Sequence, residues 1–286
     1  MRKVLCLFAL LGSVIACNNT SQPTTQDTTK QKDSISVPQA KVDEDSLNAF
    51  ADNAYENSYP GFHPEKFPWR IHQAGSVFHD GEVDPKISNT VQVGLFKRDE
   101  NDFYLDTTFV TTSREYDAVL DEDTTAATGW KVMVTKTDEP ILLMPFGKSV
   151  KPIAKVASIP MTEAEKAAEA GYTKSFTFFN KKYKLVATGE KLHVEDHIET
   201  RNYKLMIEYE KNGKQEKQLL VSLAYFDDVQ HIEILFAGDV DGDELPDFII
   251  NTSYHYNLSA PTLYLSSEAK GNDLLRVMGV QEITGC

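Results

Sequence analysis

Five acidic residues lie within one nine-residue segment, 239–247, which reads DVDGDELPD. A tight backbone coil brings carboxylates at its first, third, fifth and ninth positions toward one point, where they repel one another unless a cation lies between them. Calcium prefers oxygen cages of this kind. The segment therefore predicts a site for one calcium ion, and the alternative is a solvated acidic turn. The predicted ligands are the side chains of Asp239, Asp241, Asp243 and Asp247 and the backbone carbonyl of Leu245.

The same segment resembles the calcium loop of FG-GAP modules and integrin-type propeller blades, in which an aspartate-rich loop runs directly into an apolar strand, as 248–250 does here. The resemblance implies a calcium loop but not a propeller, because the pattern occurs only once. An EF-hand is excluded, because the loop position that requires a bidentate Glu is Ile250. The family prefers Gly where this chain has Glu244, so we expect a strained backbone at that residue.

A second group of metal-ligating residue types lies in 192–199, LHVEDHIE. On a single strand, alternate residues would share one face, and two imidazoles with carboxylates suit zinc. The zinc-protease helix motif is absent, since the Glu is misplaced. A charged, solvated strand face is the alternative. The residues concerned are His193, Glu195, His197 and Glu199.

Ser253 and His255 lie two positions apart and would share a strand face, which suggests a nucleophile and its base. The chain has no G-x-S-x-G elbow, and no Asp is placed by the sequence to orient the imidazole. Polar groups satisfied within a sheet explain the pair more simply. We therefore expect no catalytic residues, and a binding or structural role is favoured over an enzyme.

The N-terminus has the pattern of a bacterial export signal. Arg2 and Lys3 precede an apolar run, 4–11, too short to span a bilayer. The ending 14–17, VIAC, resembles the lipobox, which implies that residues 1–16 are removed and that Cys17 is acylated. A lipid-modified Cys17 would anchor the protein to a membrane of the bacterial envelope, on the periplasmic side or at the outer membrane. A permanent N-terminal membrane anchor is the alternative.

Charge and cysteine content agree with an envelope location. The formal net charge is −14, and removal of Arg2 and Lys3 leaves 27 basic against 43 acidic residues, or −16. Such a surface repels nucleic acid and favours cations as ligands. Besides Cys6 and Cys17, Cys286 is the remaining thiol, so no internal disulfide is expected in the mature chain.

The chain divides into a signal peptide, 1–16, a polar tether, 17–45, and a folded body, 46–286. The tether lacks the apolar residues needed to bury a core. In the body, 46–55 opens as a short helix, and a capping box with Thr162 and Glu165 begins a helix that ends near Gly171. Expected strands are 90–96, 103–111, 130–135, 141–145, 172–179, 202–209, 218–225, 231–236, 247–256, 262–267 and 274–283. The Asn212-Gly213 pair between 202–209 and 218–225 predicts a tight hairpin turn.

These elements predict a mainly β body with antiparallel sheets, sandwich- or barrel-like, and one or two short helices. An α+β fold is the alternative, and the helix after Pro160 allows a division into two lobes. The chain resembles uncharacterised envelope lipoproteins that carry a single FG-GAP-like loop. We expect a lipid-anchored, calcium-stabilised binding or structural module, whose partner is an envelope protein or a glycan. The alternative is a lipid-anchored hydrolase that uses a metal or the Ser253 face.

Overall fold

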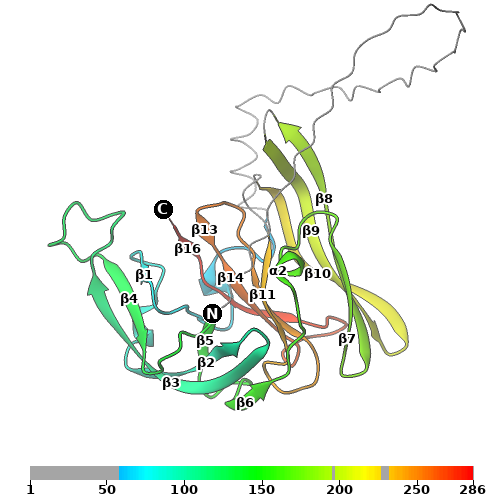
Figure 1. Cartoon of the computed structure of the whole chain (residues 1–286), viewed down its shortest axis with the longest axis horizontal. Coiled ribbons are helices and arrows are strands. Elements are labelled where there is room, and N and C mark those ends of the chain that lie inside the picture. Colours follow the sequence, from blue (N-terminus) through cyan, green and yellow to red (C-terminus); the bar gives the residue numbers. More distant parts are fainter. Residues whose placement is uncertain (1–57, 195–196, 227–231, 286) are drawn as a thin grey trace, which may run out of the picture. The chain divides into compact units, whose positions relative to one another are not determined.

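The computed structural model describes residues 58–285, except 195–196 and 227–231 (Figure 1). The described part is mainly β and antiparallel, as predicted, with one α-helical turn, α2 (Glu163–Lys166), and two 3-10 turns, η1 (Pro64–Lys66) and η2 (Pro85–Ile87). Its sheets are open, so the barrel-like alternative is wrong for these residues. No helix in the described part is long and apolar enough to cross a membrane. The signal peptide, Cys17, the tether, the helix expected at 46–55 and Cys286 lie outside the described residues.

Three sheets make up most of the fold (Figure 1). The N-terminal sheet consists of β1 (Val77–Phe78), β4 (Gly129–Val134), β3 (Asp102–Glu115), β2 (Thr90–Asp99) and β5 (Leu142–Pro145) in this order, with β6 (Ile153–Val156) paired to β3. The long-strand sheet has the order β10 (Lys214–Phe226), β9 (His197–Lys211), β8 (Lys181–Val194) and β7 (Thr173–Phe178). The C-terminal sheet has the order β11 (Glu233–Gly238), β12 (Asp247–Asn251), β14 (Pro261–Leu265) and β15 (Arg276–Val280). A two-stranded ribbon joins β13 (Leu258–Ser259) to β16 (Ile283–Thr284).

The C-terminal sheet is buried on both faces. Phe248, Ile250 and Tyr264 pack with the long-strand sheet in one apolar cluster. Ile249 and Leu263 point the other way, into a second cluster with residues of the N-terminal sheet. Burial on both faces explains why β12 and β14 are almost continuously apolar rather than alternating. The acidic segment is therefore attached to the most enclosed sheet of the fold.

Two local predictions are confirmed. Asn212 and Gly213 both have positive φ, 54° and 74°, as the tight turn between β9 and β10 requires. The Thr162 hydroxyl and the Glu165 side chain form the predicted capping box at the start of α2. The helix was expected to continue to Gly171 but ends at Lys166. Beyond it, the backbone N–H of Ala168 donates to the carbonyl of Ile232, so pairing with β11 replaces the helix.

The strand prediction missed β8 and the short strands β1, β6 and β13, and it made one strand too long. β8 was missed along most of its length, because its exposed positions carry several lysines and only alternate residues such as Leu185 and Ala187 are buried. The strand expected at 247–256 ends at Asn251. There the Asn251 Oδ1 accepts from the backbone N–H of Ala260, and the Ser253 hydroxyl donates to the backbone carbonyl of His255. The proposed division near residue 160 stays a prediction.

Candidate metal centre

The acidic segment forms the connection between β11 and β12. Gly238 and Asp247 are direct partners in the antiparallel ladder, so the loop leaves and re-enters the sheet at one point. A side chain at Gly238 would collide with the backbone of Ala157 and Ser158, at 2.3 and 2.9 Å from an added Cβ. Pairing at its base thus fixes both ends of the loop on the buried sheet.

Asp239 organises the coil of the loop. Its Oδ1 accepts hydrogen bonds from the backbone N–H groups of Gly242 and Asp243, at 2.7 and 3.0 Å, and its Oδ2 accepts from Glu244 at 3.1 Å. Gly242 and Glu244 both have positive φ, 83° and 63°. The strain expected at Glu244 is confirmed, since a residue with a Cβ occupies the left-handed region there.

Asp247 is fully buried and anchors the loop from the other side. Its Oδ2 accepts from the backbone N–H of Val240 at 2.7 Å, and its Oδ1 accepts from the backbone N–H and the hydroxyl of Ser266, at 2.7 and 2.8 Å. Burial and the nearby charge of Asp241 raise the pKa of the Asp247 carboxyl well above its ordinary value. The ionised form of the Asp247 carboxyl group is therefore energetically unfavourable in the absence of a cation.

Asp241 and Asp243 complete the acidic group. The Ser267 hydroxyl donates to Asp241 Oδ2 at 2.6 Å, whereas the buried Oδ1 has no hydrogen-bond partner among the described residues. Burial, with the charges of Asp243 and Asp239, raises the pKa of Asp241 to about 6. Asp243 Oδ1 accepts from the Leu245 backbone N–H and from the Ser266 hydroxyl, each at 2.9 Å.

Asp239, Asp241 and Asp247 come together as the sequence suggests. One carboxylate oxygen of each lies within 4.8 Å of the other two. Calcium–oxygen bonds of about 2.3–2.6 Å allow oxygens this far apart to share one ion. Asp243 lies beside this group and shares the Ser266 hydroxyl with Asp247, but its oxygens are not among the converging atoms. Within the described residues, no basic side chain forms an ion pair with the loop.

Ser266 and Ser267 are site residues that the sequence analysis missed. They follow β14 directly, and β14 pairs with β12, so the register carries both serines to the base of the acidic loop. Their hydroxyls donate to three of the loop carboxylates. Two adjacent serines after a strand are a common turn sequence, and only the β12–β14 pairing distinguishes them.

The structure does not support the zinc hypothesis for residues 192–199. β8 ends at Val194 and β9 begins at His197, and Leu192 lies opposite Glu199, so the segment is divided between two antiparallel strands and is not one strand. Glu195 lies outside the described residues. His193 is exposed on β8, whereas Glu199 is buried on β9 with the Arg201 guanidinium 3.2 Å away. The shared face predicted for these residues is therefore wrong.

Ser253 and His255 also differ from the expected arrangement. They follow the end of β12, and the Ser253 hydroxyl donates to the backbone carbonyl of His255 at 2.8 Å. The His255 imidazole contacts the Asn257 side chain through Nδ1. The serine hydroxyl and the imidazole therefore bond to different groups, in a local turn of the kind that short polar side chains form.

Comparisons with protein-family models, curated proteins and solved structures found no match to this chain. The acidic loop must therefore be interpreted from its own geometry and charge.

Proposed function

We propose that the β11–β12 loop binds one calcium ion and that the chain is a lipid-anchored, calcium-stabilised binding or structural module of a bacterial envelope. The convergence of three carboxylates around fully buried Asp247, with no ion pair to the loop from the described residues, supports the calcium site. Buried charges are stable only when they are paired, protonated or bound to a metal. A divalent cation offsets all three carboxylates at once.

The proposed ligands are Asp239, Asp241 and Asp247, with the Leu245 carbonyl and Asp243 completing the oxygen set. Every proposed metal-ligand atom is an oxygen, which suits calcium and does not suit metals that prefer sulfur ligands. Magnesium should be a poor substitute, since it demands a smaller and nearly ideal octahedron.

Calcium would stabilise the connection between strands rather than carry out a reaction. The loop carboxylates bond to the serines after β14, so an ion held by them joins β11, β12 and β14 at one end of the doubly buried sheet. The alternative of a hydrolase has less support, because the Ser253 hydroxyl bonds to a backbone carbonyl.

The location rests on the N-terminal sequence. Acylation of Cys17 and loss of residues 1–16 would leave the acidic body on a tether of about 28 residues, which spans roughly 30 Å as a coil. This arrangement suits a protein that binds an envelope protein or a glycan. Intact-mass analysis of a membrane fraction tests the anchor. A Cys17→Ser variant that still matures and stays on the membrane would contradict it.

Thermal unfolding in chelator, millimolar calcium and millimolar magnesium tests the metal site. A calcium concentration a hundredfold above the dissociation constant should raise the unfolding free energy by about 2.7 kcal/mol, because the ion binds only the folded state. For a body of this size the melting temperature should rise by roughly 5 °C or more.

Glu244→Gln is the matched control, since it removes one negative charge from the same loop outside the converging group. It should keep a calcium-dependent shift close to that of the unmodified protein. Identical melting curves in calcium and in chelator, with no calcium uptake by calorimetry, would make the loop only an acidic turn.

A further inference from the structure

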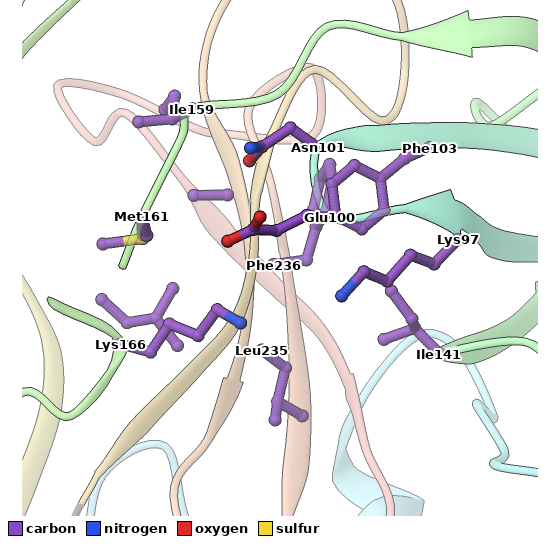
Figure 2. Close-up of a pocket in the computed structure, with 12 residues that line it drawn as sticks. Lys97, Glu100, Asn101, Phe103, Ile141, Ile159, Met161, Lys166, Leu235 and Phe236 are labelled. Atoms are coloured by element: carbon purple, nitrogen blue, oxygen red, sulfur yellow. The ribbon is translucent and has the colours of Figure 1, made fainter. Parts of the chain in front are cut away.

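The long-strand sheet has an open trough on its outer face, near the end where both of its hairpins turn. The volume of the trough is about 490 Å³, within the range of about 300–1,000 Å³ that is usual for small-molecule sites. The pocket beside β11 has only about 50 Å³, which holds one or two waters (Figure 2). Of these two concavities, only the trough has room for an organic ligand. Its polar lining consists of Ser175 and Thr177 on β7, Lys182 and Lys184 on β8, Glu208 on β9 and Gln215 on β10.

The strand register brings these polar side chains together on one face, because alternate residues of a strand point the same way. Ser175 is the cross-strand partner of Lys184, which is also the partner of Glu208. Thr177 is the partner of Lys182, two residues along the same face. A single concavity that reaches from β7 to β10 therefore requires the sheet to curve at this end.

Tight turns hold the curved end in place. The β7–β8 turn, 179–180, and the β9–β10 turn, 212–213, each consist of two residues with positive φ. Two-residue turns of this kind fix the register of the strands that they join. The positions of the lining residues are therefore set before a ligand binds, which reduces the entropy lost on binding.

The aromatic residues of the trough belong to the opposite, buried face of the sheet. Phe176 and Tyr183 alternate with the polar residues along β7 and β8, and their ring centroids stack at 5.4 Å. Tyr183 is part of the apolar cluster beneath the sheet, and Phe176 packs against that cluster. The outer face thus offers hydroxyl, amide and charged groups, which suit a ligand rich in hydroxyl groups better than an apolar peptide.

The positive charges of the trough exceed the negative ones. Glu208 lies between two lysines, with Lys217 Nζ at 3.0 Å and Lys184 Nζ at 3.7 Å from its carboxylate oxygens. The hydrogen bond from Lys217 lowers the pKa of Glu208, so this carboxylate is ionised and already compensated. Lys182 forms no ion pair with any residue that the structure describes. Its ammonium group is therefore available to a ligand carboxylate.

We propose that the trough binds an acidic sugar the size of a disaccharide. The sugar carboxylate would face Lys182, and its hydroxyl groups would bond to Ser175 and Thr177. The Gln215 amide, on the far strand, would bond to the second ring. The choice of a glycan rests on the proposed function of the chain as a binding module. The trough itself is independent of calcium, because no residue of the acidic loop lines it.

The experiment is isothermal titration calorimetry of the full chain, in excess calcium, with cellobiouronic acid, in which glucuronic acid is joined to glucose. Cellobiose is the matched neutral ligand, since it has a hydroxymethyl group in place of the carboxylate. We expect saturable binding of the acid and roughly tenfold weaker binding of cellobiose, as for the loss of one charge-assisted hydrogen bond. Inorganic phosphate, which has the charge without the sugar rings, should bind more weakly than the acid.

Three variants test the assignment of the charges. Lys182→Gln should weaken binding of the acid roughly fivefold and leave cellobiose almost unchanged. Lys181→Gln removes the same charge from the adjacent residue, which does not line the trough, and should change the affinity by less than about twofold. Glu208→Gln should strengthen binding of the acid roughly twofold to threefold, because Lys184 then loses its counter-charge.

Four outcomes would overturn the proposal. They are no saturable heat from the acid, equal affinities for the acid and cellobiose, phosphate binding as tight as that of the acid, or equal binding by Lys182→Gln and the unmodified chain. Melting curves of the same samples in calcium and in chelator separate the two proposals. Failure of the calcium site would remove the difference between these curves and leave sugar binding intact, whereas failure of the sugar site would leave the difference unchanged.

Discussion

Two loops of this protein are rich in aspartate, and the pKa values of their buried carboxyl groups shift in opposite directions. The loop 117–128 has four acids within seven residues, 117–123, a density similar to that of 239–247. Asp117 is buried, yet its pKa is lowered: burial raises it, but bonds from His79 and from the backbone N–H groups of Val119 and Leu120 outweigh burial. Hydrogen bonds from Thr128 lower the pKa of Asp121 as well.

In 239–247 the buried carboxyls have raised pKa values instead. The difference lies in the partners. Asp117 has the His79 imidazole at 2.5 Å, whereas Asp247 has only neutral donors and a second carboxylate close by. The density of acidic residues is therefore a weak sign of a cation site. The informative feature is a group of buried carboxylates that the protein's own donors and bases leave uncompensated.

The largest expected effect is a loss of stability on alanine substitution, which should depend on calcium in one loop and not in the other. Asp247→Ala removes a proposed ligand and leaves the donors of Val240 and Ser266 unpaired. In calcium it should cost about 4–6 kcal/mol of unfolding free energy and abolish the response to chelator. Asp117→Ala should lower the melting temperature equally in calcium and in chelator. Calorimetric melts of both variants check this. A calcium response that survives Asp247→Ala would break the distinction.

The next effect is a pH dependence of opposite sign in the two loops. Asp241 has a folded pKa of about 6, above its unfolded value, so in chelator its contribution to stability falls as pH rises from about 4 to 6. After allowance for partial exposure, this loss is roughly 1–2 kcal/mol. Asp241→Asn should remove it.

Asp117 behaves conversely, because its folded pKa is lowered. Its stabilisation is present above the unfolded pKa and is lost as pH falls through the folded value. Denaturant unfolding in chelator from pH 3 to 7 measures both slopes. An Asp241→Asn variant with an unchanged slope between pH 4 and 6 would contradict this assignment.

The smallest effect concerns backbone strain, which is specific to the calcium loop. Glu244→Gly replaces a residue held at φ 63° by one that adopts this conformation freely. The gain is about 1 kcal/mol or less, because glycine also increases the entropy of the unfolded chain. Calcium affinity should rise or stay equal. A lower melting temperature in both chelator and calcium would show that the Glu244 side chain stabilises the loop.

Local backbone structure could be predicted from the sequence where a few neighbouring residues determine it. The Asn212–Gly213 turn, the Thr162 capping box and the strain at Glu244 each depend on a few neighbouring residues, and each is confirmed. Convergence of Asp239, Asp241 and Asp247 also follows from spacing within one loop.

Features that depend on register could not be predicted. Ser266 reaches Asp247 only because β12 pairs with β14. The helix beginning at Glu163 stops after one turn because Ala168 bonds to Ile232, more than sixty residues away. His193 and His197 lie on two different strands, β8 and β9, which pair antiparallel, and the residues between them carry no strong turn signal in the sequence.

The doubly buried sheet also has a consequence for biosynthesis. Its strands β12, β14 and β15 follow both outer sheets in the sequence, yet they contribute to both of these apolar clusters. Neither outer sheet can complete the core that it shares with them while these strands remain inside the ribosome. Folding of the two cores should therefore be concerted, and it should begin only after β15 has emerged.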